Sequence, residues 1–232
     1  DLMHSLGIEV KASSCDGAKV RQRQTVLKMR GDARTILTAE RTLLNILSRM
    51  SGIATATRNL VDRLRKARMT VKVACTRKTA PGLLYFDKKA VQIGGGDTHR
   101  LHLDDMILIK DNHIAVAGGV GEAVRKAREG ASFSKKIEVE VTRLEEVLQA
   151  VKAGADIIML DNFSPRRIRK AIELLKRDDS RRKVLLEASG GINAKNAMDF
   201  ASTGVDVVSL GELTQSSRAL NFSLEIDRTE KR

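Results

Sequence analysis

Cationic side chains gather in one stretch of the sequence, from Thr76 to His113. Three of the four histidines fall here, beside the run Gly94-Gly95-Gly96. Such glycines allow a ligand to approach the backbone closely, or elements to pack tightly. Cations that could converge on carboxylates or phosphates are Arg77, Lys78, His99, Arg100 and Lys110. Arginine matches a planar carboxylate with two parallel donors. The stretch predicts a site for a small, multiply charged anion, with unrelated surface charges as the alternative.

A second set of polar residues follows five short apolar runs that begin at Met106. The runs span residues 106–109, 137–141, 157–160, 184–186 and 205–210. At or near their ends stand Lys110, Glu140, Asp161, Ser189-Gly190-Gly191 and Gly211. Charged groups are costly inside a strand unless they are paired or at its end. Polar groups in phase at five strand ends are typical of the active-site face of an α/β barrel.

The elements that must position these residues alternate along the chain. Amphipathic helical patterns separate the apolar runs, for example at residues 120–128 and 144–151. Strands alternating with helices predict a parallel sheet buried on both faces. An open doubly wound sheet gives the same local signals. The polar strand ends favour an α/β fold with an incomplete, open barrel of the TIM type.

The first 70 residues follow a different pattern. Residues 7–10 and 25–29 read as short strands around a turn at 15–17, and a long helix is expected to open at Thr38. We expect a partial N-terminal α/β sandwich domain over 1–40 and connecting helices over 41–70. The barrel with its active site should span 71–212, and a C-terminal segment, 213–232, should return to the N-terminal domain.

Composition narrows the function classes. The chain has 232 residues and a formal net charge of +13, which indicates anionic partners. Aromatic residues make up only 3%, too few to stack on single-stranded nucleic acid. No apolar run is long enough for a membrane span and no signal peptide is visible, so we expect a cytoplasmic protein. Two distant cysteines without metal-ligand spacing fit a reducing compartment. Cys75 reads as a small buried hydrophobe.

The motifs together resemble the quinolinate phosphoribosyltransferase family. The segments that carry the resemblance are residues 40–45, 51–55, 76–82, 94–100, 108–113, 138–141, 160–162 and 189–191. It runs from about Gly7 to Leu224. The family implies transfer of a phosphoribosyl group from phosphoribosyl pyrophosphate to quinolinate, with decarboxylation, in NAD biosynthesis. Family members usually have a longer N-terminal domain, so about 50 further residues are expected upstream.

The resemblance also implies roles for individual residues. Members form dimers or larger even assemblies, and Arg41 resembles an arginine donated across the interface. Thr76, Arg77, His99, Arg100 and Lys110 resemble the pocket for quinolinate, and Lys78 would lie beside them or contact the donor. The donor's ribose and its Mg²⁺ would be held by Glu140 and Asp161, with Glu138 as the competing choice to Glu140. The 5-phosphate would lie in backbone cradles formed by Ser189, Gly190 and Gly191 and by Leu210, Gly211 and Glu212. The catalytic set would be Lys110, Glu140 and Asp161.

Two departures and two alternatives accompany this interpretation. Leu84 lies where many relatives carry an arginine, and Glu212 would repel a phosphate unless it points away. A sister enzyme with another acceptor, such as nicotinate or a molybdenum-pathway substrate, has the same fold. A nucleic-acid-binding module could use the basic stretch from Arg166 to Lys183. We expect small-molecule substrates and neither nucleic acid nor membrane as partners.

Overall fold

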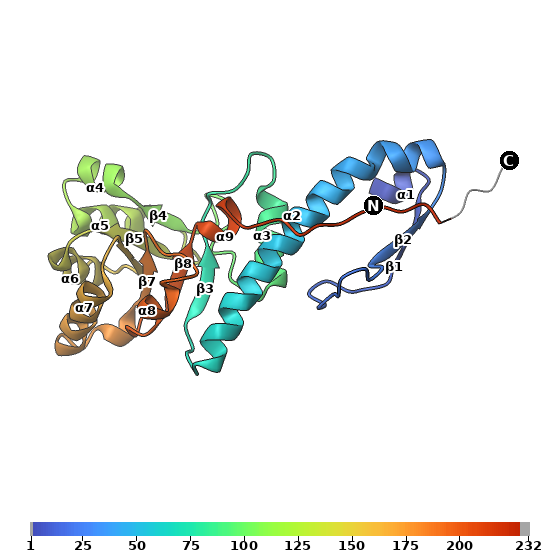
Figure 1. The fold of residues 1–232 in the computed structure, drawn as a ribbon. Helices are drawn as coiled ribbons and strands as arrows, with labels where there is room; N and C mark the ends of the chain where they lie inside the picture. The colour runs from blue at the N-terminus through green and yellow to red at the C-terminus, as the bar shows by residue number, and fades with distance from the viewer. Residues whose placement is uncertain (1, 228–232) are drawn as a thin grey trace.

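The computed structural model describes residues 2–227 of the chain. It begins with the short helix α1 (Leu2–Ser5) and an antiparallel hairpin of β1 (Glu9–Ala12) and β2 (Leu27–Arg30). Helix α2 (Ala33–Lys66) then spans 34 residues and runs from the hairpin to the start of β3 (Lys72–Cys75), an edge strand of the second sheet (Figure 1). It starts before Thr38 because the Asp32 carboxylate accepts the Thr35 N–H at 3.0 Å and caps the first turn. One helix therefore stands where connecting helices were expected.

Six parallel strands form the second sheet, in the order β3-β8-β7-β6-β5-β4. The strands are β3 (Lys72–Cys75), β4 (Ile107–Ile109), β5 (Ile137–Val141), β6 (Ile157–Asp161), β7 (Leu185–Ser189) and β8 (Val207–Leu210). The connecting helices are α3 (Leu84–Ile93), α4 (Asp111–Ala117), α5 (Val120–Gly130), α6 (Leu144–Lys152), α7 (Pro165–Arg177), α8 (Ala197–Ala201) and α9 (Glu212–Gln215). A single 3₁₀ turn, η1 (Arg181–Lys183), follows α7. In each strand–helix–strand unit the helix carries the chain back across the sheet, so that the next strand runs parallel to the one before it, as the sequence pattern predicts.

The barrel stays open because its two edge strands, β3 and β4, do not pair with each other among residues 2–227. A short parallel bridge between Ala74 and Asp97 extends the sheet beside β3. The predicted incomplete α/β barrel with a small N-terminal unit is thus confirmed. Within the described residues, no helix is long and apolar enough to cross a membrane.

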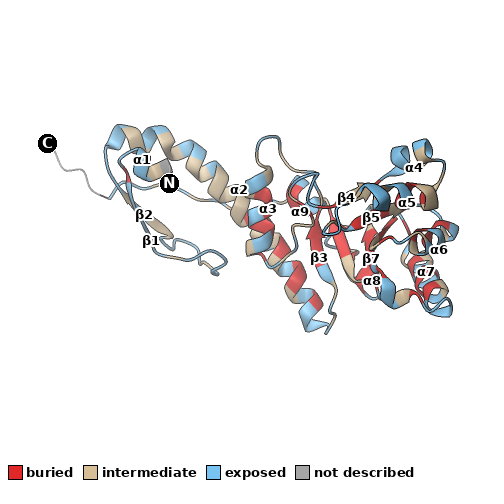
Figure 2. Cartoon of the chain, turned by 180° about the vertical axis from the view of Figure 1, so that it is seen from behind, coloured by how far each residue is buried: buried red, intermediate tan, exposed pale blue. Residues whose placement is uncertain are grey.

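Apolar side chains fill the space between the sheet and its outer helices, where burial concentrates in Figure 2. On β5, Ile137, Val139 and Val141 are buried in this core. Alternate residues point to opposite faces of a strand, so Glu138 and Glu140 face the barrel interior. The fold therefore positions charged side chains inside the barrel by strand alternation alone.

The last described residues, after α9, run back along α2 (Figure 1). The Leu220 N–H donates to the Ser48 carbonyl at 3.0 Å. At Gly52 of α2, an added Cβ would collide with the Arg218 carbonyl, so only glycine fits this crossing. The crossing ties the chain beyond the barrel to the helix that begins in the N-terminal unit.

Candidate active site

Three predicted residues meet at the carboxyl ends of neighbouring strands. Lys110 follows β4, Glu140 lies on β5 and Asp161 ends β6. The Lys110 Nζ donates to Glu140 Oε2 at 2.8 Å. Burial, followed by the nearby charge of Glu140, raises the pKa of Asp161. A half-exposed lysine with two facing carboxylates can hold hydroxyl groups and stabilise a developing positive charge.

The glycine residues predicted to bind phosphate lie at the next strand ends. Asp161 pairs in register with Ser189 at the end of β7, and the Asn162 N–H donates to the Ser189 carbonyl at 2.9 Å. Gly190 and Gly191 have φ angles of +89° and +64°, and a Cβ on Gly190 would collide with Asn162. Side-chain-free backbone in this conformation can approach an anion closely.

Gly211, the other predicted cradle, lies at the end of β8 beside the loop after β3. A Cβ on Gly211 would lie 3.4 Å from Thr76 Oγ1 and 3.4 Å from Lys78 Cδ. The Leu210 side chain packs into the core, so only its backbone can reach a ligand. The Glu212 carboxylate accepts the Ala194 N–H at 2.7 Å. Its charge is therefore partly satisfied by the loop after β7.

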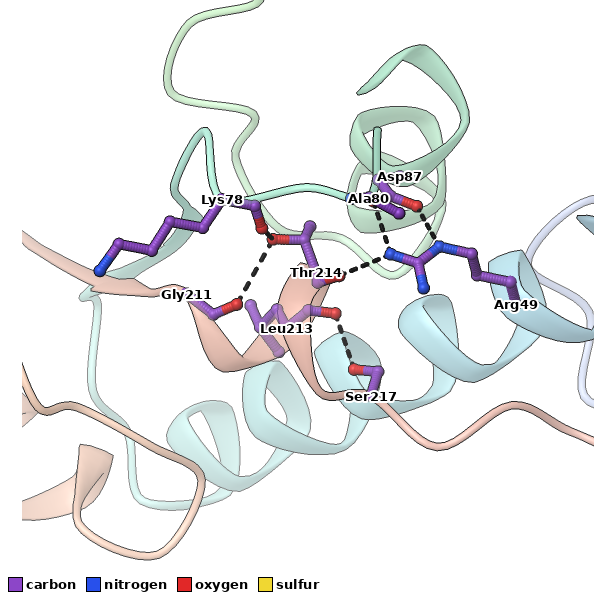
Figure 3. A network of polar contacts seen from close by, with 8 residues as sticks. All are labelled: Arg49, Lys78, Ala80, Asp87, Gly211, Leu213, Thr214 and Ser217. Carbon is purple, nitrogen blue, oxygen red and sulfur yellow. Dashed lines mark hydrogen bonds and ion pairs between the residues drawn. The ribbon is translucent and has the colours of Figure 1, made fainter. Parts of the chain in front are cut away.

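A buried polar network fixes the loop that carries Thr76, Arg77 and Lys78 (Figure 3). Arg49 of α2 binds both oxygens of Asp87, at 2.7 and 2.8 Å, and also donates to the Thr214 carbonyl at 2.7 Å. Asp87 accepts the Ala80 N–H at 3.2 Å, and the Thr214 hydroxyl donates to the Lys78 carbonyl at 2.7 Å. Helices α2, α3 and α9 together hold this loop at the mouth of the barrel.

Two predicted arginines lie close to each other. Arg100 is only 8% exposed, and its guanidinium makes no direct hydrogen bond or ion pair with any residue in the described part of the chain. Burial, followed by the charge of Arg77, lowers its pKa. The buried Lys88 of α3 feels the charges of both arginines. A buried arginine that lies beside a second, exposed arginine and has no acidic partner needs an anion to balance it.

His99 lies deeper than the sequence suggested. Its Nε2 lies 3.1 Å from an oxygen of Glu138 and 3.1 Å from an oxygen of Glu187, inside the barrel. Burial lowers the pKa of His99, but the two carboxylates beside Nε2 outweigh it and raise the pKa to about 10. Burial also raises the pKa of Glu138. We call these three residues the His99 cluster.

Glu187 was missed by sequence reasoning. The apolar run predicted the strand only over 184–186, whereas β7 continues to Ser189 and carries Glu187 in its middle. The Ser209 Oγ of β8 donates to Glu187 Oε1 at 2.6 Å. An isolated acid flanked by Leu186 and Ala188 was the available signal, because a charge within an apolar strand needs a partner.

Arg41 is the predicted site residue that does not join the others within this chain. It is exposed and lies in the amino-terminal half of α2. That half of the helix leads away from the barrel (Figure 1). Exposure there leaves its charge available to another molecule.

A cavity of about 520 Å³ opens at the amino-terminal ends of the barrel strands, opposite the candidate site, and His99 and Glu187 form part of its lining.

Among the described residues, two groups of side chains offer ligand atoms that suit a metal ion. Glu140 and Asp161 supply the hard oxygen ligands that Mg²⁺ prefers, and both face the barrel mouth. The ligand atoms of the His99 cluster lie within 4.8 Å of one another, in the buried interior. Of the two acids on β5, Glu140 is the one at the mouth, while Glu138 is fully buried.

Comparisons with known proteins identify matches to both parts of the chain. The family model for the quinolinate phosphoribosyl transferase C-terminal domain matches residues 53–225, and the model for the N-terminal domain of the same enzyme matches residues 1–51. These two models together account for almost the whole sequence.

Individual relatives agree with the family models. The chain is 50% identical over 211 residues to a Methanothermobacter thermautotrophicus protein named probable nicotinate-nucleotide pyrophosphorylase (carboxylating), covering 91% of this chain and 76% of that one. It is 43% identical to the human protein named nicotinate-nucleotide pyrophosphorylase (carboxylating), covering 91% and 70%. The solved Francisella tularensis nicotinate-nucleotide pyrophosphorylase is 42% identical, with a TM-score of 0.85 over 94% of this chain and 76% of that one.

Proposed function

The chain belongs to the quinolinate phosphoribosyltransferase family, and from this premise we propose that it is a carboxylating nicotinate-nucleotide pyrophosphorylase. It transfers the phosphoribosyl group of phosphoribosyl pyrophosphate to the nitrogen of quinolinate. The products are nicotinate mononucleotide, pyrophosphate and CO₂, and the reaction belongs to NAD biosynthesis. Both cysteines are free, which fits the cytoplasm.

One observation carries this proposal. Arg100 is buried beside Arg77 without a partner in the described residues, while Glu140 and Asp161 stand together on neighbouring strands. The arginines suit the carboxylates of quinolinate, and the acids suit a ribose whose C1 becomes positive as pyrophosphate leaves. Cationic and acidic subsites on adjoining strand ends match an enzyme that joins a dicarboxylate to a sugar.

The cations act by binding and orienting quinolinate. Arg77, Arg100 and Lys110 bind its carboxylates, with Thr76, Lys78 and His99 completing the pocket. Because the pyridine nitrogen is itself the nucleophile, the chain needs no serine or cysteine nucleophile. Holding that nitrogen close to C1 of the donor lowers the barrier by proximity and orientation.

The acids and glycines hold the donor. Glu140 and Asp161 bind the ribose hydroxyls and stabilise the positive charge on the sugar. The backbone of Gly190, Gly191 and Gly211 receives the 5-phosphate, together with Ser189, Leu210 and Glu212. Mg²⁺, held by Glu140 and Asp161 largely through the donor, would neutralise the charge of the leaving pyrophosphate. After CO₂ leaves, Lys110 is our candidate to supply a proton to the ring carbon.

We assign Arg41 to a neighbouring subunit's site. It is exposed, and within its own chain it does not join the other cations. A homodimer or larger even assembly would bring it to the mouth of the partner's barrel. Mixing inactive Arg41→Ala and Glu140→Gln proteins tests this assignment, because shared sites restore part of the activity, whereas self-contained sites restore none.

The deciding experiment incubates the protein with quinolinate, phosphoribosyl pyrophosphate and Mg²⁺. Release of CO₂ together with nicotinate mononucleotide supports the proposal. Turnover of nicotinate alone would instead support the sister-enzyme alternative. Omitting Mg²⁺, with EDTA present, should abolish turnover and separates the metal requirement from the rest of the mechanism.

The arginine subsite gives a sharper test. Arg100→Ala should weaken quinolinate binding about 10- to 100-fold, because one charge-assisted contact contributes about 1.5–3 kcal/mol. Binding of phosphoribosyl pyrophosphate should stay unchanged. Calorimetric titration with each substrate measures both affinities, with the exposed Arg166→Ala on α7 as the matched control. Equal loss of both affinities would remove Arg100 from the quinolinate subsite.

A further inference from the structure

The His99 cluster lies directly beneath the proposed active site. Glu138 precedes Glu140 by two residues on β5, and Glu187 precedes Ser189 by two on β7. Side chains two apart on a strand point the same way, so the cluster forms the next layer down inside the barrel. Its three residues come from different segments: His99 from the loop after α3, and the acids from two strands that flank β6.

The cluster holds one cation and two acids, an unbalanced set for a buried site. Glu138 is completely buried, and neither of its oxygens accepts a well-directed hydrogen bond from any described residue. A buried acid without full satisfaction costs stability. The closest positive charge to Glu138 is the His99 ring, 3.1 Å away. The carboxylate of Glu138 therefore acts mainly on the charge and orientation of that ring.

The loop that carries His99 is fixed from several sides. Asp97 donates its N–H to the Val73 carbonyl at 2.7 Å and accepts the Cys75 N–H at 3.1 Å. The Lys88 Nζ donates to the Thr98 carbonyl at 2.5 Å. The His99 backbone is left-handed, with φ of +61°, and its N–H donates to Asp97 Oδ1 at 2.7 Å. A strained backbone of this kind persists only where its surroundings enforce it.

We propose that Glu138 and Glu187 are positioning residues that hold the His99 ring in one orientation and in its cationic form, beneath the cations that bind quinolinate. The inference rests on the proposed function of the site. The acids act through His99 and through the adjoining Arg100, and they touch neither substrate. A ring anchored through Nε2 presents a fixed positive charge to a dicarboxylate without needing to reorient or take up a proton on binding.

The charged groups around His99 favour this form. Glu138 faces it from β5 and Glu187 from β7, where the Ser209 hydroxyl of β8 fixes the Glu187 carboxylate. Asp97 binds its backbone within the loop, and Arg100 follows it. The two carboxylates, each 3.1 Å from Nε2, dominate the charge environment of the ring. The imidazolium should therefore persist well above the ordinary imidazole pKa of about 6.5.

The test combines Glu187→Gln with a direct measurement on His99. Nitrogen-15 NMR of the imidazole should show His99 doubly protonated at about pH 8 in the wild type and largely neutral in Glu187→Gln. At that pH the variant's KM for quinolinate should rise about tenfold, the loss of one charge-assisted contact, and recover towards about pH 6. The KM for phosphoribosyl pyrophosphate should not move. The exposed Glu173→Gln on α7 is the matched control.

A double-mutant cycle separates positioning from general structural support. If Glu187 acts through His99, adding Glu187→Gln to His99→Gln should raise the quinolinate KM no further. Additive effects would overturn the proposal. Should Glu187→Gln fail to fold, Ser209→Ala frees the same carboxylate and should shift the His99 NMR signals in the same direction.

The NMR result stands apart from the proposed function. A wild-type His99 that is neutral at about pH 8 overturns the positioning role, even if the enzyme turns over quinolinate. A charged His99 in a protein that does not turn over quinolinate leaves the cluster intact and refutes the function instead. One equivalent of a divalent metal in the purified protein, lost in Glu187→Gln, would also overturn the proposal, because a metal-bound Nε2 carries no proton.

Discussion

Two buried ionic groups in this barrel differ in how completely they are satisfied. The Arg49–Asp87 group pairs one cation with one acid, and its atoms also bind the Thr214 carbonyl and the Ala80 N–H (Figure 3). The His99 cluster sets one cation against two acids and leaves Glu138 without a well-directed hydrogen bond among the described residues. The first joins α2, α3 and α9, whereas the second lies beneath the strand ends.

The difference indicates what each group contributes. A fully satisfied pair fixes geometry and is costly to break, because either partner alone is an uncompensated buried charge. An under-satisfied cluster persists at a cost in stability, and such exceptions concentrate at functional sites. Stability measurements on matched substitutions should therefore give opposite results in the two groups.

Asp87→Asn should produce the largest effect. It removes the charge that Arg49 binds with two donors, and breaking a buried pair in this way costs about 3–5 kcal/mol of unfolding free energy. Urea unfolding measures the loss. Glu122→Gln, in an exposed pair with Arg125, should be indistinguishable from wild type. A loss below about 1 kcal/mol at Asp87 would show that this group is not what holds the barrel to α2.

Sequence reasoning succeeded where local chemistry is repetitive. The alternation of apolar runs and amphipathic helices predicted the parallel barrel strands, and β5 has the predicted bounds of residues 137–141. These features depend on residues near one another in sequence.

It failed where distant segments meet. Nothing local distinguishes Asp87 from a solvated helix residue, because its partners Arg49 and Thr214 come from elsewhere in the chain. His99 was grouped with the cations around it, although its ring binds acids from two strands. Only tertiary structure shows which carboxylate meets which cation. The roles of the individual site residues accordingly stay predictions.

A pH titration of stability should give the second-largest effect. Folding raises the pKa of His99 from 6.5 to about 10, so its contribution is complete below about pH 6.5 and is lost as pH rises towards 10. The difference in unfolding free energy between wild type and His99→Gln should shrink by at most about 1.4 kcal/mol per pH unit in that window.

Subtracting the variant removes the contribution of other groups that titrate between neutral and alkaline pH. Arg49→Gln is the control from the satisfied pair, since a guanidinium keeps its charge throughout this range. Its difference from wild type should be independent of pH. A flat difference for His99→Gln as well would mean that the imidazole is not held in its charged form by the fold.

The smallest effect should have the opposite sign. Glu138→Met leaves His99 and Glu187 as a one-to-one pair and replaces an under-satisfied buried acid with an apolar side chain of similar length. Unfolding free energy should rise by up to about 1 kcal/mol. Glu187→Met is the matched control, and it should destabilise the protein because it leaves the buried Ser209 hydroxyl without its acceptor. If both substitutions destabilise the protein by several kcal/mol, the two acids are equally satisfied, and the contrast with Arg49–Asp87 disappears. If only Glu138→Met stabilises the fold while quinolinate turnover falls, Glu138 is retained for activity at the expense of stability.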